Sequence, residues 1–273
     1  QGTEHQDAVD GMIPVEGIQR GEKCIGTTRK EIDLSTEDGA KNFILKNKPD
    51  AVIHCAAYTA VDKAESEAEL AITVNGLGAR RIAEACREID AKMLFVSTDY
   101  VFGGDGKTPY ETTDEKNPVN TYGRSKLLGE DAVSMILKKY FIVRTSWLFG
   151  DHGKNFIKTM LNLADKNKKL RVVNDQIGSP TYTADLAPLI ADMIQTDKFG
   201  VYHATNEGFC TSDLAELLCY KLVCGSPFAT DGRDDGAFFL EFGKGFVHLL
   251  AVCSERGGYL ASRNRLACCT HGS

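Results

Sequence analysis

Thr98, Tyr122 and Lys126 are residues whose types and spacing suit acid–base chemistry. Tyr122 and Lys126 lie four positions apart, so on a helix they would face the same point in space. A phenol has a pKa of roughly 10, and a nearby ammonium group stabilises the phenolate and lowers that pKa. Thr98 could then hold a carbonyl oxygen beside the phenol. These residue types therefore indicate the proton-donating site of a reductase.

A Tyr-x-x-x-Lys pair alone is a weak signal, because the two residue types occur at that spacing by chance in many helices. The stretch from Ser97 to Glu130 supplies more context. It begins at the end of an apolar run, passes through a loop rich in Gly and Pro, and ends on the helical segment that carries the pair. The interpretation therefore depends on the elements that position this stretch.

Apolar runs alternate with helical periods through the middle of the chain. Strands are predicted at residues 23–27, 50–57, 92–98, 140–146, 170–173 and 200–205. Helices are predicted at residues 38–47, 64–89, 155–164, 183–195 and 211–220. This alternation predicts a parallel sheet with right-handed crossovers. In such sheets ligands bind at the carboxyl ends of the strands, which is where Thr98 lies.

Composition limits the classes of partner. The 273 residues suffice for one large domain or two modest ones. The net charge of −6 argues against nucleic acid, because phosphate binding needs a basic surface. No apolar run approaches the roughly 18 residues of a membrane span, so we expect no membrane contact and a cytoplasmic location. The nine cysteines show no C-x-x-C spacing, so buried free thiols are expected and no metal site.

Five blocks of sequence resemble the dTDP-4-dehydrorhamnose reductase family, within the extended short-chain dehydrogenase/reductases. These blocks are CAAYTAVDKAE (55–65), STDYVFGG (97–104), NPVNTYGRSKLLGE (117–130), VRTSWLFG (143–150) and NDQIGSPTYTADLA (174–187). The resemblance covers roughly residues 23–218. Several ordered motifs at family-like spacing are strong evidence where each alone is weak.

The resemblance implies an α/β fold, with a Rossmann-like doubly wound parallel sheet and a smaller substrate-binding C-terminal domain. Residues 1–143 and 174–210 would form the dinucleotide-binding domain. Residues 144–173 and 211–273 would form the substrate-binding domain, of which the part after about residue 221 is atypical.

The resemblance also implies a reaction, in which NADPH or NADH delivers hydride to the C4 ketone of dTDP-4-dehydro-L-rhamnose to give dTDP-L-rhamnose. Thr98, Tyr122 and Lys126 match the family's catalytic set, with Tyr122 as the proton donor. Lys126 would lower the pKa of Tyr122 and bond the nicotinamide ribose. The positions that match cofactor-binding residues are Asp33, Leu34, Ala56, Ala57, Tyr58, Thr59, Tyr122 and Lys126. The positions that match sugar-nucleotide contacts are Val61, Asp62, Thr98, Asp99, Tyr100 and Trp147.

Two departures from the family pattern stand at the ends of the chain. The family's first strand and its Gly-rich turn, of the form TGANGQLG, do not occur in residues 1–22. Such a turn presents backbone N–H groups to a pyrophosphate, so its loss would weaken cofactor binding. The tail after about residue 221 does not match the family's C-terminal segment. The family allows an Mg²⁺ ion and a homodimer, but no matching acidic residues are found in this tail.

Several alternatives remain open. Arg29 would favour the 2′-phosphate of NADPH, whereas Asp33 would oppose it. A non-catalytic regulatory subunit resembling the β subunit of methionine adenosyltransferase shares the fold and much of the motif set, and a retained Thr-Tyr-Lys set does not exclude it. A dehydratase or epimerase is less consistent with the sequence. A dehydratase would want an acidic pair beside the catalytic hydroxyl, but Asp99 is followed by Tyr100.

Overall fold

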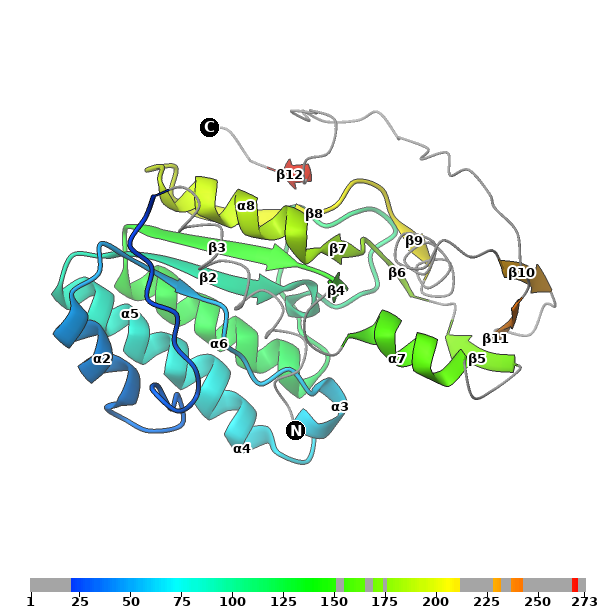
Figure 1. Cartoon of the computed structure of the whole chain (residues 1–273), viewed down its shortest axis with the longest axis horizontal. Coiled ribbons are helices and arrows are strands. Elements are labelled where there is room, and N and C mark those ends of the chain that lie inside the picture. The colour runs from blue at the N-terminus through cyan, green and yellow to red at the C-terminus, as the bar shows by residue number, and fades with distance from the viewer. Residues whose placement is uncertain are drawn as a thin grey trace.

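A five-stranded sheet forms the centre of the protein in a computed structural model that describes residues 21–150, 155–164, 169–173, 176–211, 228–231, 237–242 and 267–269. Its strands, in spatial order, are β1 (Ala51–His54), β2 (Lys92–Thr98), β3 (Tyr140–Thr145), β8 (Gly200–Thr205) and β12 (Ala267–Cys269). The first four are parallel, and β12 pairs antiparallel with β8 at the edge. The predicted α/β fold with a parallel sheet is confirmed (Figure 1).

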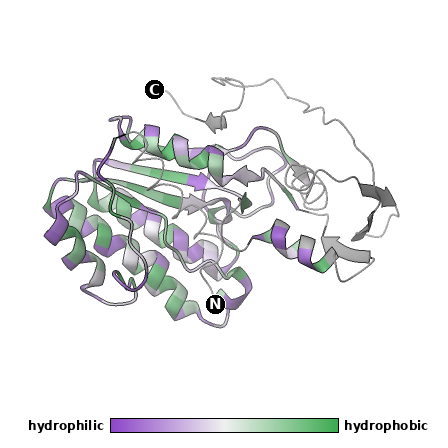
Figure 2. Ribbon diagram, viewed as in Figure 1, coloured by the Kyte–Doolittle hydropathy of each residue, from purple (hydrophilic) through white to green (hydrophobic). Residues whose placement is uncertain are grey.

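Helices cover both faces of this sheet. Leu94 and Val96 of β2 pack against α8 (Thr183–Ile194) on one face. Met93 and Phe95 pack on the other face, in the cluster that includes α5 (Gly78–Glu88) and α6 (Thr121–Ile136). Because both faces are covered, β2 reads as a nearly continuous apolar run and not as an alternating one. Figure 2 shows this hydrophobic character along β2 and β3.

The predicted helix over residues 64–89 is wrong as a single element. The structure divides the region into α3 (Val61–Ala64), α4 (Ala68–Ala71), a π-helix η1 (Ile72–Leu77) and α5. The Asn75 amide in η1 bonds the backbone of Tyr58, whose N–H donates to Oδ1 at 2.7 Å and whose carbonyl accepts from Nδ2 at 3.0 Å. The wider turn of the π-helix directs the Asn75 amide toward this neighbouring loop, and π segments occur frequently at functional sites.

The strand predicted at residues 23–27 is also wrong, because these residues are exposed and form no strand. The first regular element that the structure describes is α2 (Gly39–Asn47), which packs against α5. The short apolar run KCIGT is exposed to solvent, so its composition alone does not make it a strand. The predicted helix over residues 211–220 lies outside the described residues except for Thr211.

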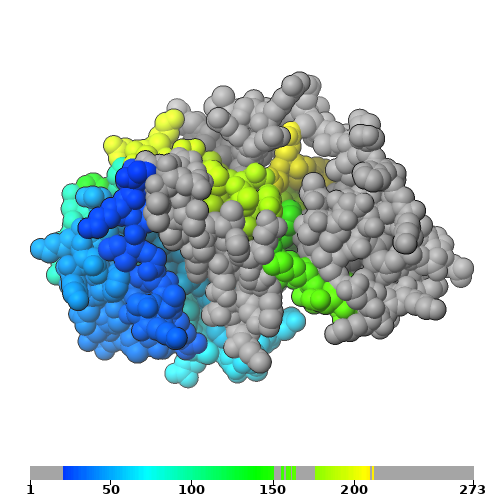
Figure 3. Space-filling view, viewed as in Figure 1, coloured from blue at the N-terminus to red at the C-terminus, as the bar shows by residue number. Residues whose placement is uncertain are grey.

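Smaller elements lie beyond the carboxyl ends of β2 and β3 (Figure 1). A three-stranded antiparallel sheet has the order β10 (Phe228–Asp231), β11 (Ala237–Phe242) and β5 (Lys169–Val173), and α7 (Phe156–Ala164) contacts β5. Two short pairs join β4 (Leu148–Phe149) to β7 (Thr181–Tyr182) and β6 (Ile177–Gly178) to β9 (Cys210–Thr211). In Figure 3, α7 appears as a green band on the molecular surface.

Two bulk properties of the described residues complete the fold. None of the helices in this part of the chain has the length and apolar character needed to cross a membrane. Cys55 and Cys86 are buried, as expected of core thiols, whereas Cys24 is exposed. Burial raises the pKa of the Cys86 thiol to about 12, so this side chain stays protonated at neutral pH.

Candidate active site

Thr98, Tyr122 and Lys126 meet at the carboxyl end of β2. Thr98 is the last residue of that strand, and Tyr122 and Lys126 project from the first turns of α6. All three side chains are buried, and Lys126 is only 1% exposed. A hydrogen bond joins the Thr98 and Tyr122 side chains. The predicted grouping of the three residues at this edge of the sheet is therefore present.

The start of α6 is fixed by two acidic or amide side chains. Asn120 is the N-cap, and its Oδ1 accepts the Gly123 N–H at 2.7 Å. Glu65, which follows α3, accepts the Thr121 N–H at 2.7 Å and the Thr121 hydroxyl at 2.9 Å. Together these bonds satisfy backbone donors that a helix start leaves without intrahelical partners. They set the first turn of α6, and with it the position of Tyr122.

Lys126 is held against β2. Its Nζ donates to the Val96 carbonyl oxygen at 2.7 Å and lies 4.1 Å from the centroid of the Phe95 ring. A cation over an aromatic face is stabilised by the ring quadrupole. These contacts, both to β2, explain how an ammonium group can be held inside the protein.

The pKa of Tyr122 is raised above the usual phenol value. Burial is the main cause, the Asp99 carboxylate and Tyr100 add to it, and the hydrogen bond with Thr98 acts in the opposite direction. That Lys126 lowers this pKa stays a prediction, and the ammonium group contacts Val96 and Phe95 of β2. Tyr122 is a neutral phenol throughout the physiological range.

Asp99 lies next to Thr98 in the chain, and its surface is only half-buried. Its Oδ1 accepts the Thr98 hydroxyl at 2.9 Å, and the Tyr100 N–H donates to Thr98 Oγ1 at 3.2 Å. Burial raises the pKa of Asp99 to about 6, whereas hydrogen bonds from Thr98 and the backbone lower it. Asp99 is therefore mostly ionised at neutral pH and holds the Thr98 hydroxyl in one orientation.

Three of the residues predicted to bind the sugar nucleotide surround Tyr122. The Tyr100 ring stands edge-on to the Tyr122 ring, with centroids 5.7 Å apart. Val61 packs against the apolar cluster that contains Tyr122. The negative charge of Asp62, together with burial and Asp99, raises the pKa of Tyr100. With Thr98 and Asp99, these residues form one continuous group.

Trp147 occupies a different position, just after β3. Its backbone has a φ of 47°, which is unusual for a residue with a side chain. The indole lies against Gly178, where an added Cβ would approach its ring atoms to 2.7 Å. The Thr181 N–H donates to the Trp147 carbonyl at 3.2 Å. Trp147 therefore joins the end of β3 to the loop of residues 176–181.

The segment predicted to line the cofactor follows β1. Ala56 is exposed, Ala57 and Tyr58 are buried, and Thr59 is half-buried. Small side chains here leave the backbone open to a flat ligand at the carboxyl edge of the sheet. Asn75 ties this segment to α6, because its Nδ2 also donates to Ser125 Oγ at 2.9 Å and Ser125 donates to the Tyr122 carbonyl at 2.7 Å. Residues 56–59 are thereby held next to the turn of α6 that carries Tyr122.

Asp33 and Leu34, two of the predicted cofactor-binding residues, lie near the start of α5. Leu34 is buried against α5, where its Cβ would lie 3.2 Å from a Cβ added to Gly78. The Asp33 carboxylate accepts the Ser35 N–H at 2.9 Å and the Ser35 hydroxyl at 2.6 Å, and these bonds lower its pKa, with a smaller contribution from Arg29. Residues 1–20, in which the sequence shows no Gly-rich turn of the family type, lie outside the described residues.

Comparison with known proteins decides the family. The family described as RmlD substrate binding domain matches residues 12–222. The chain belongs to this family. The family predicted from the sequence blocks is confirmed, and the match ends close to residue 221, after which the sequence becomes atypical.

The relatives include named reductases. The dTDP-4-dehydrorhamnose reductase of Mycolicibacterium smegmatis is 44% identical over 222 residues, which cover 80% of this chain and 67% of that protein. The spore coat polysaccharide biosynthesis protein SpsK of Bacillus subtilis is 41% identical over 193 residues, covering 71% of this chain and 68% of that protein. The crystal structure of dTDP-4-dehydrorhamnose reductase from Bacillus anthracis in complex with NADP matches with a TM-score of 0.75 and 39% identity, over 79% of this chain and 77% of that one.

Sequence reasoning missed two charged residues of this RmlD family member. Glu130 and Arg144 are buried, with 1% and 3% exposure, and form an ion pair directly behind Ser97. A signal was present, because Arg144 interrupts the apolar strand YFIVRTS and Glu130 follows Lys126 by one helical turn. A charge inside a buried strand requires a partner, and Glu130 was in reach of the same face.

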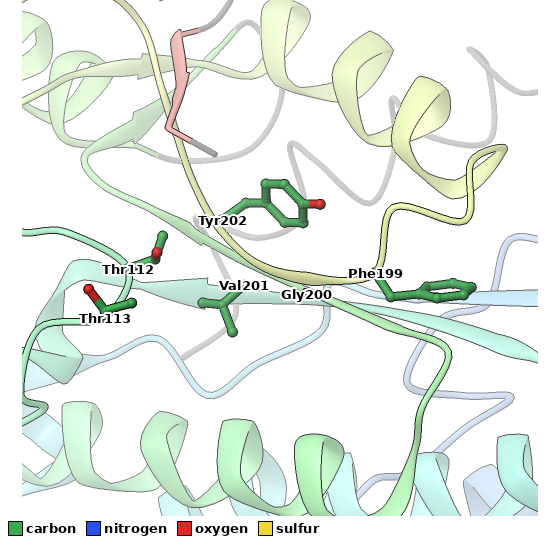
Figure 4. Close-up of a pocket in the computed structure, with 6 residues that line it drawn as sticks. All are labelled: Thr112, Thr113, Phe199, Gly200, Val201 and Tyr202. Atoms are coloured by element: carbon green, nitrogen blue, oxygen red, sulfur yellow. The ribbon is translucent and has the colours of Figure 1, made fainter. Parts of the chain in front are cut away.

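The described residues contain no metal-binding group, and one cavity that they form lies away from the predicted centre. They contain no group of three or more His, Cys, Asp or Glu side chains that could hold a metal ion, so they do not fit the Mg²⁺ that the resemblance allows. A shallow cavity of about 270 Å³ lies along the start of β8 and includes none of the predicted site residues (Figure 4). It is lined by Thr112, Thr113, Phe199, Gly200, Val201 and Tyr202.

Proposed function

We propose that this chain catalyses the NAD(P)H-dependent reduction of the C4 ketone of dTDP-4-dehydro-L-rhamnose to dTDP-L-rhamnose. The observation that carries the proposal is the buried Tyr122 phenol, hydrogen-bonded to Thr98 at the carboxyl end of β2. Membership of a family with named dTDP-4-dehydrorhamnose reductases supports the choice of substrate. An NADP complex of one such relative supports the choice of cofactor.

Tyr122 is suited to act as the acid in this reaction. A bound NADPH or NADH would supply the hydride, and its arrival at C4 leaves an alkoxide that needs a proton. Because its pKa is raised, Tyr122 keeps its proton until a stronger base such as this alkoxide is next to it. Lys126 holds a positive charge against Val96 and Phe95 of β2. This charge can compensate the Tyr122 phenolate that proton transfer produces.

Thr98 and Asp99 act together on the substrate oxygen. The Asp99 carboxylate accepts the Thr98 hydroxyl, and the Tyr100 N–H donates to Thr98 Oγ1. These two contacts hold Thr98 in one orientation beside the Tyr122 hydroxyl. A donor that is already oriented needs no reorganisation during the reaction, and such preorganisation is a large contribution to catalysis.

The other predicted positions take binding roles in this proposal. Asp33, Leu34 and residues 56–59 would hold the dinucleotide. Val61, Asp62, Asp99, Tyr100 and Trp147 would contact the sugar nucleotide. Residues 144–173 and 211–273 would form the substrate domain, although β12 of that tail pairs with β8 of the large sheet.

A turnover assay with the purified chain tests the proposal. We expect NADPH absorbance to fall when both NADPH and dTDP-4-dehydro-L-rhamnose are present, and to stay constant when either is omitted. A parallel calorimetric titration with NADPH separates the alternatives. Binding of NADPH without any turnover of the keto-sugar would contradict the reductase and favour the non-catalytic regulatory subunit, whereas absence of both would show that this chain does not hold the cofactor.

A further inference from the structure

Both carboxylate oxygens of Glu130 accept hydrogen bonds, although the residue is almost completely buried. Arg144 Nε donates to Oε1 at 2.9 Å, and Arg144 Nη2 donates to Oε2 at 2.8 Å, so the pair is bidentate. The Ser97 hydroxyl donates to the same Oε1 at 2.6 Å. Charge-assisted bonds of this kind are short and directional. The three side chains therefore form a rigid connection between α6, β3 and β2.

This connection lies one residue from the proposed catalytic threonine. Ser97 pairs with Arg144 in the parallel register of β2 and β3, and Thr98 pairs with Thr145. Three turns of α6 therefore bind three adjacent residues of β2. Lys126 binds the Val96 carbonyl, Glu130 binds Ser97, and Tyr122 bonds Thr98.

The same pair also holds the loop between Thr98 and α6. Arg144 Nη1 donates to the Thr112 carbonyl at 3.2 Å, and its guanidinium lies 5.0 Å from the Phe102 ring centroid. Phe102 in turn stacks on Tyr110, with ring planes 6° apart and centroids separated by 4.5 Å. Lys116 Nζ lies 4.0 Å from Glu130 Oε2 at the other end of the loop.

A buried ion pair is weak evidence for stability, because desolvation of both charges offsets their attraction. Its geometric effect is different, since a bidentate pair with a third donor permits few arrangements. In this protein the constrained atoms are the end of β2 and the face of α6, which carry Thr98 and Tyr122. The ion pair thus controls a distance that the proposed reaction needs.

We propose that Ser97, Glu130 and Arg144 form a positioning cluster that fixes the end of β2 against α6 and so sets the contact between Thr98 and Tyr122. This inference rests on the proposed reductase function. The three residues act through Thr98 and Tyr122 and do not touch the substrate. Ser97 is the residue to change, because its removal leaves the ion pair intact and does not strand a buried charge.

Steady-state kinetics of Ser97→Ala test the cluster. We expect kcat to fall roughly 10- to 100-fold, as for a small misplacement of reacting groups, with little change in KM for the keto-sugar. Ser97→Thr restores a hydroxyl and should recover most of kcat. The matched control is Ser134→Ala, at an exposed serine of α6 whose hydroxyl donates to the Asp131 carbonyl, and it should behave as the wild type.

Amide hydrogen exchange gives a readout that does not depend on turnover. In Ser97→Ala, we expect faster exchange at residues 98–101 and unchanged exchange at the amino end of β3. If the wild type shows no turnover, the proposed function fails while this measurement still decides the cluster. Wild-type exchange at residues 98–101 would overturn the inference, as would a wild-type kcat in an active enzyme. Loss of exchange protection across the whole sheet would show a merely structural role and would also overturn it.

Discussion

At the scale of single residues, Tyr122 and Asp99 show how burial sets protonation at the site. Both acids have a pKa above the ordinary value, and burial is the first cause for each. The two groups differ in charge at neutral pH because the ordinary pKa is about 10 for a phenol and about 4 for a carboxylic acid. At neutral pH, Tyr122 therefore remains a donor while Asp99 is an acceptor that orients Thr98. Burying the Asp99 charge has a cost in stability that depends on pH.

Asp99→Asn should reveal this cost. The pKa of Asp99 is raised from 3.8 to about 6 in the folded protein, so its favourable contribution is complete below about pH 4 and is lost as pH rises through about 6. We expect the variant to be more stable than the wild type at about pH 8, by at most about 3 kcal/mol, and less where water screens the half-buried carboxylate. The difference should vanish at about pH 4.

Urea unfolding of both proteins at the two pH values measures this difference. Asp38→Asn, at an exposed aspartate before α2, removes one negative charge from the surface and controls for the change in net charge. A wild type that is more stable than Asp99→Asn at the higher pH would contradict the predicted sign.

The residue types of the site could be predicted, whereas their electrostatics could not. Thr98, Tyr122 and Lys126 were identified from spacing and from the blocks around them. The direction of the pKa shift of Tyr122 depends on how deeply the ring is buried and on Asp99 and Tyr100 beside it. It also depends on the direction of the Lys126 ammonium group, which points to Val96. None of these is fixed by a four-residue spacing.

At the scale of elements, close contact between α6, β2 and η1 holds the site together. Gly129 makes this possible, because an added Cβ there would lie 2.6 Å from the Asn75 carbonyl oxygen and 2.8 Å from the Phe95 ring. The π segment η1 brings Asn75 to this contact. Its occurrence could not be predicted, since the apolar period of residues 70–89 continues through it without interruption. The alternation of strands and helices could be predicted, because each apolar run is long and bounded.

Gly129→Ala tests this packing. Alanine favours a helix over glycine by about 1 kcal/mol, but the collision with Asn75 and Phe95 should outweigh that gain. We expect a net loss of about 1–3 kcal/mol in the free energy of unfolding, as for overpacked cores. Chemical denaturation measures it, with Ser134→Ala on the exposed face of α6 as the control. An unchanged or increased stability would show that α6 and η1 are not in such close contact.

At the scale of the whole molecule, the parallel sheet brings together residues that are distant in the sequence. Residues 56–59, Thr98 and Tyr122 follow or face the carboxyl ends of neighbouring strands, so a single edge contains the proposed cofactor and substrate positions. This edge could be predicted from the alternation alone. The antiparallel pairing of β12 and the sheet of β5, β10 and β11 could not, because the sequence after about residue 221 has no sustained period.

The central claim is that this edge transfers hydride to a keto-sugar with Tyr122 as the acid. Its most direct test is isotope transfer to dTDP-4-dehydro-L-rhamnose from NADPH that carries deuterium at both C4 positions of the nicotinamide, with the product analysed by mass spectrometry. We expect one deuterium at sugar C4 with the wild type and with Tyr140→Phe, a control at the opposite end of β3. Tyr122→Phe should bind the sugar nucleotide but form product about 10²–10⁴-fold more slowly. A product without deuterium, or an unchanged rate in Tyr122→Phe, would contradict the claim.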